Sequence, residues 1–170
     1  QINNPPFDDE KLNAYEVGTK LSFMDKKARL NLSGFYYDYK NIQVQSFRIP
    51  GPPTILNASS AKLYGLDADL ELQPTEALTL TATMSIVHTE FGDFPNAEFY
   101  GKCGPAAPVG ACSPGNVAAG SSFYIYLANA KGNPLPLAPS FTGSVAANYT
   151  IPVGSGKVDL NASYAYNGGF

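Results

Sequence analysis

Residues 66–86 read LDADLELQPTEALTLTATMSI, and apolar residues occupy every second position on both sides of Pro74. They are Leu66, Ala68, Leu70 and Leu72 before the proline, and Leu78, Leu80, Ala82, Met84 and Ile86 after it. Side chains two apart in an extended chain point to the same side, so this period predicts two strands, each with one apolar face. The residues between them, Pro74 to Glu76, are typical of a tight turn. The stretch therefore predicts an antiparallel hairpin.

The same period of two recurs along the chain and predicts six strands. Their ranges are 13–24, 28–45, 57–73, 77–89, 139–151 and 157–167. Short connections at 25–27, 74–76 and 152–156 alternate with long ones at about 46–56 and 90–138. An up-and-down antiparallel membrane barrel alternates in this way, because one rim has short turns and the other has long loops. A soluble sandwich would more often have short turns at both ends.

Most charged residues of the predicted strands share one face: Glu16, Lys20, Arg29, Asp67, Asp69, Glu71 and Asp159. The apolar face has no charge until Asp38 and Lys62, which lie beyond the apolar band toward the long connections. Aromatic residues lie near both ends of the other face, with Tyr15, Tyr36, Tyr64 and Tyr164 toward the long connections and Phe23 and Tyr149 toward the short ones. Aromatic girdles of this kind are typical of the two interfaces of a bilayer. The pattern favours a lipid-facing barrel. The alternative is a soluble or surface-attached β-sandwich used for adhesion or carbohydrate binding.

The composition excludes other classes. Charged residues are 15% of the 170 residues, and the net charge is -3, so the chain lacks the basic excess of a nucleic-acid-binding protein. The two long uncharged runs, 103–130 and 132–156, each contain several prolines. Neither can be a membrane-spanning helix of about 20 residues, and any membrane crossing must be made by strands.

Three stretches resemble the C-terminal half of the barrel of TonB-dependent outer-membrane receptors. They are NAYEVGTKLSFMDKKARLNLSGFYYDYKNIQVQ (13–45), NASSAKLYGLDADLELQPTEALTLTATM (57–84) and GNPLPLAPSFTGSVAANYTIP (132–152), in the family's order. The resemblance implies a bacterial outer-membrane protein, surrounded by outer-membrane lipids, with a 22-stranded barrel and a plugged lumen. It also implies active import of a scarce nutrient, first of all an iron–siderophore complex, with energy from the TonB complex. Receptors for cobalamin and oligosaccharides share the pattern.

Six strands are too few for a complete barrel of this kind. The smallest single-chain membrane barrels have eight strands, and an open sheet edge in lipid leaves backbone groups unpaired at several kcal/mol each. We therefore expect residues 1–170 to be one partial barrel domain of a longer protein. The closing strands and the plug domain, through which the TonB complex would act, are expected outside this chain.

The ionisable residues of the strands are expected to be structural. His88 continues the apolar series of Met84 and Ile86, which places it at the outer rim. Asp67, Asp69 and Glu71 share the polar face and could suggest a cation site or an acid/base pair. They are more simply explained as a wetted barrel wall that pairs with Lys20 or Arg29. No catalytic, metal or cofactor site is expected, and an outer-membrane barrel enzyme is the third hypothesis.

The connection from about 92 to 137, in which no strand is predicted, carries the candidate ligand-contacting residues. They are the aromatic residues Phe94, Phe99, Tyr100, Phe123, Tyr124 and Tyr126, among few charges. Rigid aromatic side chains suit the capture of a bulky, partly apolar ligand. The other interpretation is a loop that packs on its neighbours and covers the barrel mouth.

The same connection contains both cysteines of the chain, Cys103 and Cys112. In an oxidising compartment, two cysteines in a loop rich in Pro and Gly are expected to form a disulfide. A metal-binding pair is the alternative, and it lacks further ligands nearby.

Overall fold

The computed structural model describes residues 8–46, 54–57, 60–112 and 122–169, and the regular elements of these residues are β-strands. Their bounds are β1 (Lys11–Phe23), β2 (Ala28–Lys40), β3 (Gln43–Ser46), β4 (Thr54–Asn57), β5 (Ser60–Thr75), β6 (Leu78–Phe91), β7 (Ala97–Lys102), β8 (Phe123–Ala128), β9 (Phe141–Val153) and β10 (Gly156–Asn167). Within these ranges, no helix has the length and apolar character needed to cross a membrane.

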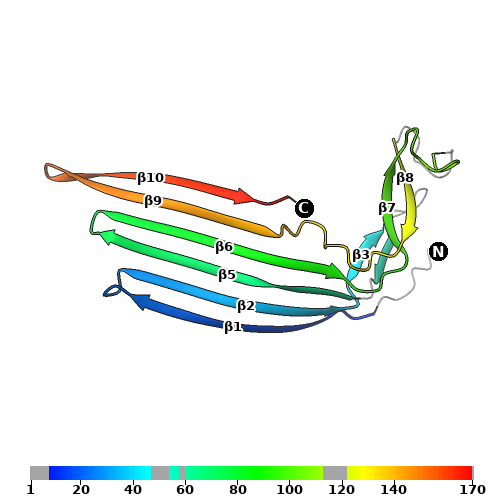
Figure 1. Ribbon diagram of the computed structural model, residues 1–170, viewed down its shortest axis with the longest axis horizontal. Helices are drawn as coiled ribbons and strands as arrows, with labels where there is room; N and C mark the ends of the chain where they lie inside the picture. The colour runs from blue at the N-terminus through cyan, green and yellow to red at the C-terminus, as the bar shows by residue number, and fades with distance from the viewer. Residues whose placement is uncertain (1–7, 47–53, 58–59, 113–121, 170) are drawn as a thin grey trace. The chain divides into compact units, whose positions relative to one another are not determined.

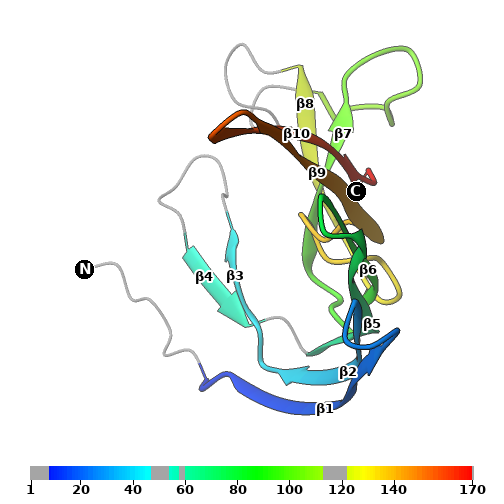
Figure 2. The same ribbon diagram turned by 90° about the vertical axis from the view of Figure 1, so that its left-hand side faces the viewer.

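The six long strands form one sheet in the order β1-β2-β5-β6-β9-β10 (Figure 1). Neighbours in the sheet are also successive long strands in the chain, which is an up-and-down topology. Seen from its end, the sheet follows a curve, as the wall of a barrel does (Figure 2). The two short pairs, β3 with β4 and β7 with β8, lie in the long connections. The predicted all-β fold with about six antiparallel strands is confirmed.

Two predicted strand boundaries are wrong. The strand predicted at 28–45 stops one residue before Asn41, and β3 follows as a separate strand that pairs with β4. Asn41 has a φ of 55°, which takes the chain out of the extended conformation, and Asn is among the residues that tolerate such a value. The strand predicted at 57–73 starts later, because Asn57 belongs to β4 and β5 begins at Ser60.

The three predicted short turns are present at residues 24–27, 76–77 and 154–155. At the β5–β6 turn, the backbone N–H of Leu78 donates a hydrogen bond to Thr75 Oγ1, at 3.2 Å. Left-handed φ values reverse the chain at the other two turns, in Met24 (54°), Asp25 (53°), Lys26 (67°) and Gly154 (58°). These tight turns keep one rim of the sheet short.

The register of β6, β9 and β10 confirms the predicted faces. Leu80 is paired with Ala147, which is paired with Ala162 in the next strand. Side chains of paired residues lie on the same side of a sheet, so apolar residues meet apolar ones. On the polar face, side chains are joined across strands by the hydrogen bonds Thr83–Ser144 (2.8 Å), Asn161–Asn148 (2.6 Å) and Thr150–Asp159 (2.6 Å).

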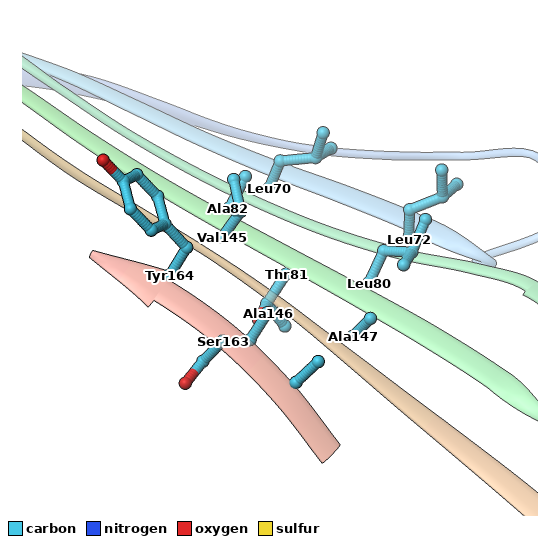
Figure 3. Close-up of a pocket in the computed structure, with 11 residues that line it drawn as sticks. Leu70, Leu72, Leu80, Thr81, Ala82, Val145, Ala146, Ala147, Ser163 and Tyr164 are labelled. Atoms are coloured by element: carbon cyan, nitrogen blue, oxygen red, sulfur yellow. The ribbon is translucent and has the colours of Figure 1, made fainter. Parts of the chain in front are cut away.

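The apolar face of the sheet is exposed. Val17 is 77% exposed and Leu160 is 53% exposed, and the buried hydrophobic residues of the described ranges are all alanines: Ala28, Ala61, Ala97 and Ala130. Leu80 and Ala82 project to this side and Thr81 to the opposite side (Figure 3). A β-sandwich would cover such a face with a second sheet, whereas a lipid-facing barrel wall carries it outward.

The chain divides into two compact units. The sheet unit consists of residues 14–37, 63–89 and 134–170, and the loop unit consists of residues 1–13, 38–62 and 90–133. The sheet unit holds most of the long strands, and the loop unit holds both short strand pairs. We describe each unit separately.

Leu80→Arg tests the apolar face against the neighbouring Thr81→Arg. An arginine on the lipid side costs up to about 2–4 kcal/mol at the bilayer midplane, because the charge is forced into hydrocarbon. Thr81→Arg is expected to cost much less, since position 81 lies on the polar side. The measurement is the free energy of unfolding of the complete protein from lipid vesicles. Equal destabilisation at both positions would contradict the assigned faces.

Candidate functional site

The connection between β6 and β9 is not a loop without strands, and that prediction is wrong. Residues 97–102 and 123–128 form the antiparallel hairpin β7–β8, in which Phe99 is paired with Tyr126 and Gly101 with Tyr124. The hairpin escaped the sequence analysis because apolar residues occupy both of its faces. The strand predictions depended on the alternation of polar and apolar residues, and this alternation is absent from the hairpin.

One face of the hairpin, the stacked face, contains Phe99, Gly101, Tyr124 and Tyr126. The ring centroids of Phe99 and Tyr126 are 5.6 Å apart, and those of Tyr124 and Tyr126 are 5.8 Å apart. Such aromatic pairs contribute about 0.5–1.5 kcal/mol each beyond the area they bury. The Phe99–Tyr126 pair therefore helps to hold β7 and β8 together, and the Tyr124–Tyr126 pair continues the row of rings along β8.

Gly101 leaves room for this packing. A Cβ atom built at this position would run into the ring of Tyr124. A glycine in a strand often marks a place where another group approaches the backbone closely. Gly101 thus lets the Tyr124 ring lie across β7.

The opposite face, the open face, contains Glu98, Tyr100, Lys102, Phe123, Ile125 and Leu127. Tyr100 is 58% exposed, and Phe123 and Leu127 are each 51% exposed. Its apolar centre lies between one acidic and one basic residue of β7. Two of the candidate aromatic residues, Tyr100 and Phe123, thus lie on the open face. Three others, Phe99, Tyr124 and Tyr126, lie on the stacked face.

Phe94, the sixth candidate, lies on neither face. Its ring centroid is 6.1 Å from that of Phe91, at the base of the hairpin. The backbone N–H of Phe94 donates to the side-chain oxygen of Asn129, at 3.0 Å. Phe94 therefore belongs to the support of the hairpin.

The acidic residues of the polar face, considered from sequence as a cation site or an acid/base pair, lie among polar and basic neighbours. Ser85 donates a hydrogen bond to Asp67, at 2.6 Å. Asp67 and Asp69 border a polar hollow with Lys20, and Asp69 and Glu71 border another with Arg29. Among the residues that the structure describes, no three His, Cys, Asp or Glu side chains are placed to hold a metal ion.

His88 belongs to an aromatic row on the apolar face. Its ring centroid is 4.8 Å from that of Tyr64, which is 6.4 Å from that of Tyr36. The row crosses β6, β5 and β2, and its members lie toward the long connections. This arrangement corresponds to the aromatic girdle expected at one membrane interface.

The comparisons with known proteins agree with this architecture. Residues 1–170 match the family model described as TonB dependent receptor-like, beta-barrel. The chain belongs to this family. The sheet unit is therefore part of a TonB-dependent receptor barrel, and the apolar face is the outer surface of an outer-membrane β-barrel. This membership rules out the alternative hypothesis of a β-sandwich.

Two solved receptors are similar in structure. The ferric yersiniabactin uptake receptor FyuA from Yersinia pestis is 17% identical, with a TM-score of 0.63 over 96% of this chain and 19% of that chain. The alcaligin outer membrane receptor FauA from Bordetella pertussis is 19% identical, with a TM-score of 0.46 over 92% of this chain and 23% of that chain. The chain spans about a fifth of the length of the solved receptors it matches. Because the sequence identity to FyuA is 17%, this likeness shows the fold alone.

Cys103 and Cys112 form a disulfide bond, and their Cα atoms are 5.9 Å apart. Cys103 directly follows β7, and its backbone N–H donates to the carbonyl of Ser122, at 2.8 Å. The covalent link and the backbone hydrogen bond thus lie together at the outer end of the hairpin.

We predict that the disulfide is formed in the native protein. A closed loop of about ten residues contributes about 2.7 kcal/mol by chain entropy, and most of this orders the loop instead of the barrel. Thiol-reactive labels applied to the native protein without reductant are expected to modify neither cysteine. Labelling of both would show that the pair is reduced.

Proposed function

We propose that this chain is part of an outer-membrane active transporter that imports an iron–siderophore complex, with energy from the TonB system. The TonB complex acts through a plug domain outside residues 1–170. Outer-membrane lipids cover the apolar face of the sheet, and the hairpin β7–β8 contributes to ligand capture. The process is transport and includes no covalent chemistry by this chain.

The match of the whole chain to the TonB-dependent receptor barrel carries this proposal. The similar structure FyuA is an uptake receptor for a ferric siderophore, which favours that class of cargo over cobalamin or an oligosaccharide. The long connections of such barrels lie on the extracellular side, where a ligand arrives. The hairpin belongs to one of these connections.

The open face of the hairpin has the chemistry for a bulky, partly apolar ligand. Tyr100 and Phe123 are more than half exposed and have few rotatable bonds, so they supply contact area at low entropic cost. Lys102 and Glu98 on the same face can contact polar groups at the edge of the ligand. On the stacked face, Tyr126 is less exposed, at 45%. We therefore assign ligand contact to the open face, whose rings are the more exposed.

Uptake of radioactive iron tests the proposed function. Cells in which the complete receptor is the sole outer-membrane route for ferric siderophores are expected to accumulate iron from at least one member of a ferric siderophore panel. Accumulation is expected to require TonB, because the inner-membrane complex supplies the energy. The control is the same strain without TonB but with the receptor assembled. Uptake that is independent of TonB, or that is restricted to a corrinoid or an oligosaccharide, would disprove the proposal.

The double variant Tyr100→Ala, Phe123→Ala tests the open face. Loss of both rings is expected to lower affinity for the transported ferric complex at least about tenfold, or about 1.4 kcal/mol. Val109→Ala is a suitable control, since Val109 is a fully exposed apolar residue of the same connection that belongs to neither β7 nor β8. Assembly in the membrane is expected to be unchanged in all variants. Unchanged affinity in the double variant would move the ligand contacts to other loops or to the plug.

A further inference from the structure

One amide side chain, that of Asn129, closes the base of the hairpin. Its Oδ1 accepts hydrogen bonds from the backbone N–H groups of Phe94 and Lys131, each at 3.0 Å. Its Nδ2 donates to Asp93 Oδ1, at 2.8 Å. Asn129 therefore joins the segment that enters the hairpin to the segment that leaves it. We call residues 91–94 and 129–133 the neck.

Backbone hydrogen bonds complete the neck. The N–H of Ala130 donates to the carbonyl of Phe94 (3.0 Å), the N–H of Phe91 to that of Asn133 (2.9 Å), and the N–H of Gly132 to that of Phe91 (2.9 Å). Gly132 has a φ of 80°, and Ala130 is only 4% exposed. The Asn129 side chain adds a hydrogen bond to the Asp93 side chain across the neck, at 2.8 Å.

The neck is also fixed to the start of β5. The N–H of Gly92 donates to the carbonyl of Ser60, at 2.7 Å. A Cβ atom at position 92 would collide with the Ser60 side chain, so a glycine is needed for this approach. Asp93 and Phe94, the two residues that Asn129 contacts on the entering segment, thus directly follow an anchored residue.

We propose that Asn129 is the positioning residue of the hairpin, which holds the open face in one orientation for ligand capture. This role rests on the proposed function. A preorganised loop loses less conformational freedom on binding, so its affinity is higher than that of a loop free to swing at its base. The Asn129 amide supplies both kinds of group on one short side chain: its oxygen accepts two of these hydrogen bonds and its nitrogen donates the third.

A swap of the two side chains provides the test. In Asn129→Asp, the new carboxylate cannot donate to Asp93 and faces a like charge, and this repulsion moves it away from the Phe94 and Lys131 amides. Adding Asp93→Asn restores a donor and an acceptor with their positions exchanged. A residue whose role is only to fill space would not be rescued in this way. The single variant Asp93→Asn is the matched control, since Asn129 can still donate to an amide oxygen.

The first readout needs no ligand. Hydrogen exchange of the Phe94 and Lys131 backbone amides, measured in the complete receptor, is expected to be at least about tenfold faster in Asn129→Asp, equivalent to about 1.4 kcal/mol. Exchange is expected to return close to the native rate in the double variant and to stay close to it in Asp93→Asn. Unchanged exchange in Asn129→Asp, or no rescue in the double variant, would overturn the proposal.

The second readout is affinity for the ferric siderophore that the native receptor takes up from the panel. It is expected to fall in Asn129→Asp and to recover in the double variant, with membrane assembly constant. If exchange changes but affinity does not, Asn129 orders the neck without positioning ligand contacts, and the proposal is wrong. If the native receptor takes up no ferric siderophore, the proposed function fails, and so does the role in ligand capture. The exchange data would then still show whether Asn129 closes the neck.

Discussion

Backbone hydrogen bonding in lipid is the constraint on which the sheet unit depends. Hydrocarbon offers no water to an N–H or C=O group, so each group must find its partner in a neighbouring strand. The long, uninterrupted ladders that join β6 to β9 and β9 to β10 meet this requirement. Because the ladder fixes which side chains share a side, the same constraint produces one face for lipid and one for the aqueous lumen. The small number of buried hydrophobic residues in the described part of the chain is explained by this constraint.

This constraint explains why the sheet could be predicted from sequence. A strand between lipid and water alternates between apolar and polar residues along its whole length, as residues 66–86 do, and the pattern can be read without any tertiary contact. The prediction failed where the chain leaves the sheet. Asn41 ends β2 through one backbone angle, and a polar residue in a strand pattern does not reveal that angle.

The candidate site could be predicted only as a list of aromatic residues. Their division into a stacked and an open face depends on the register of β7 with β8, in which Phe99 is paired with Tyr126 and Tyr100 with Ile125. No local pattern specifies that register, since the hairpin is apolar on both sides. Asn129 was missed altogether, because a single Asn near a Gly and a Pro is typical of any turn. Its importance lies in partners up to 36 residues away.

The hairpin and the sheet are stabilised by different means, and this difference bears on specificity. A two-stranded hairpin in water is marginal by itself. Here it is supported by stacked rings, by the Cys103–Cys112 link and by the hydrogen bonds of Asn129. These three supports are made by residues outside the open face. In the proposed function, the residues that contact ligand are therefore different from those that make these supports, and the chemistry that selects a ligand can differ between receptors that share the same barrel.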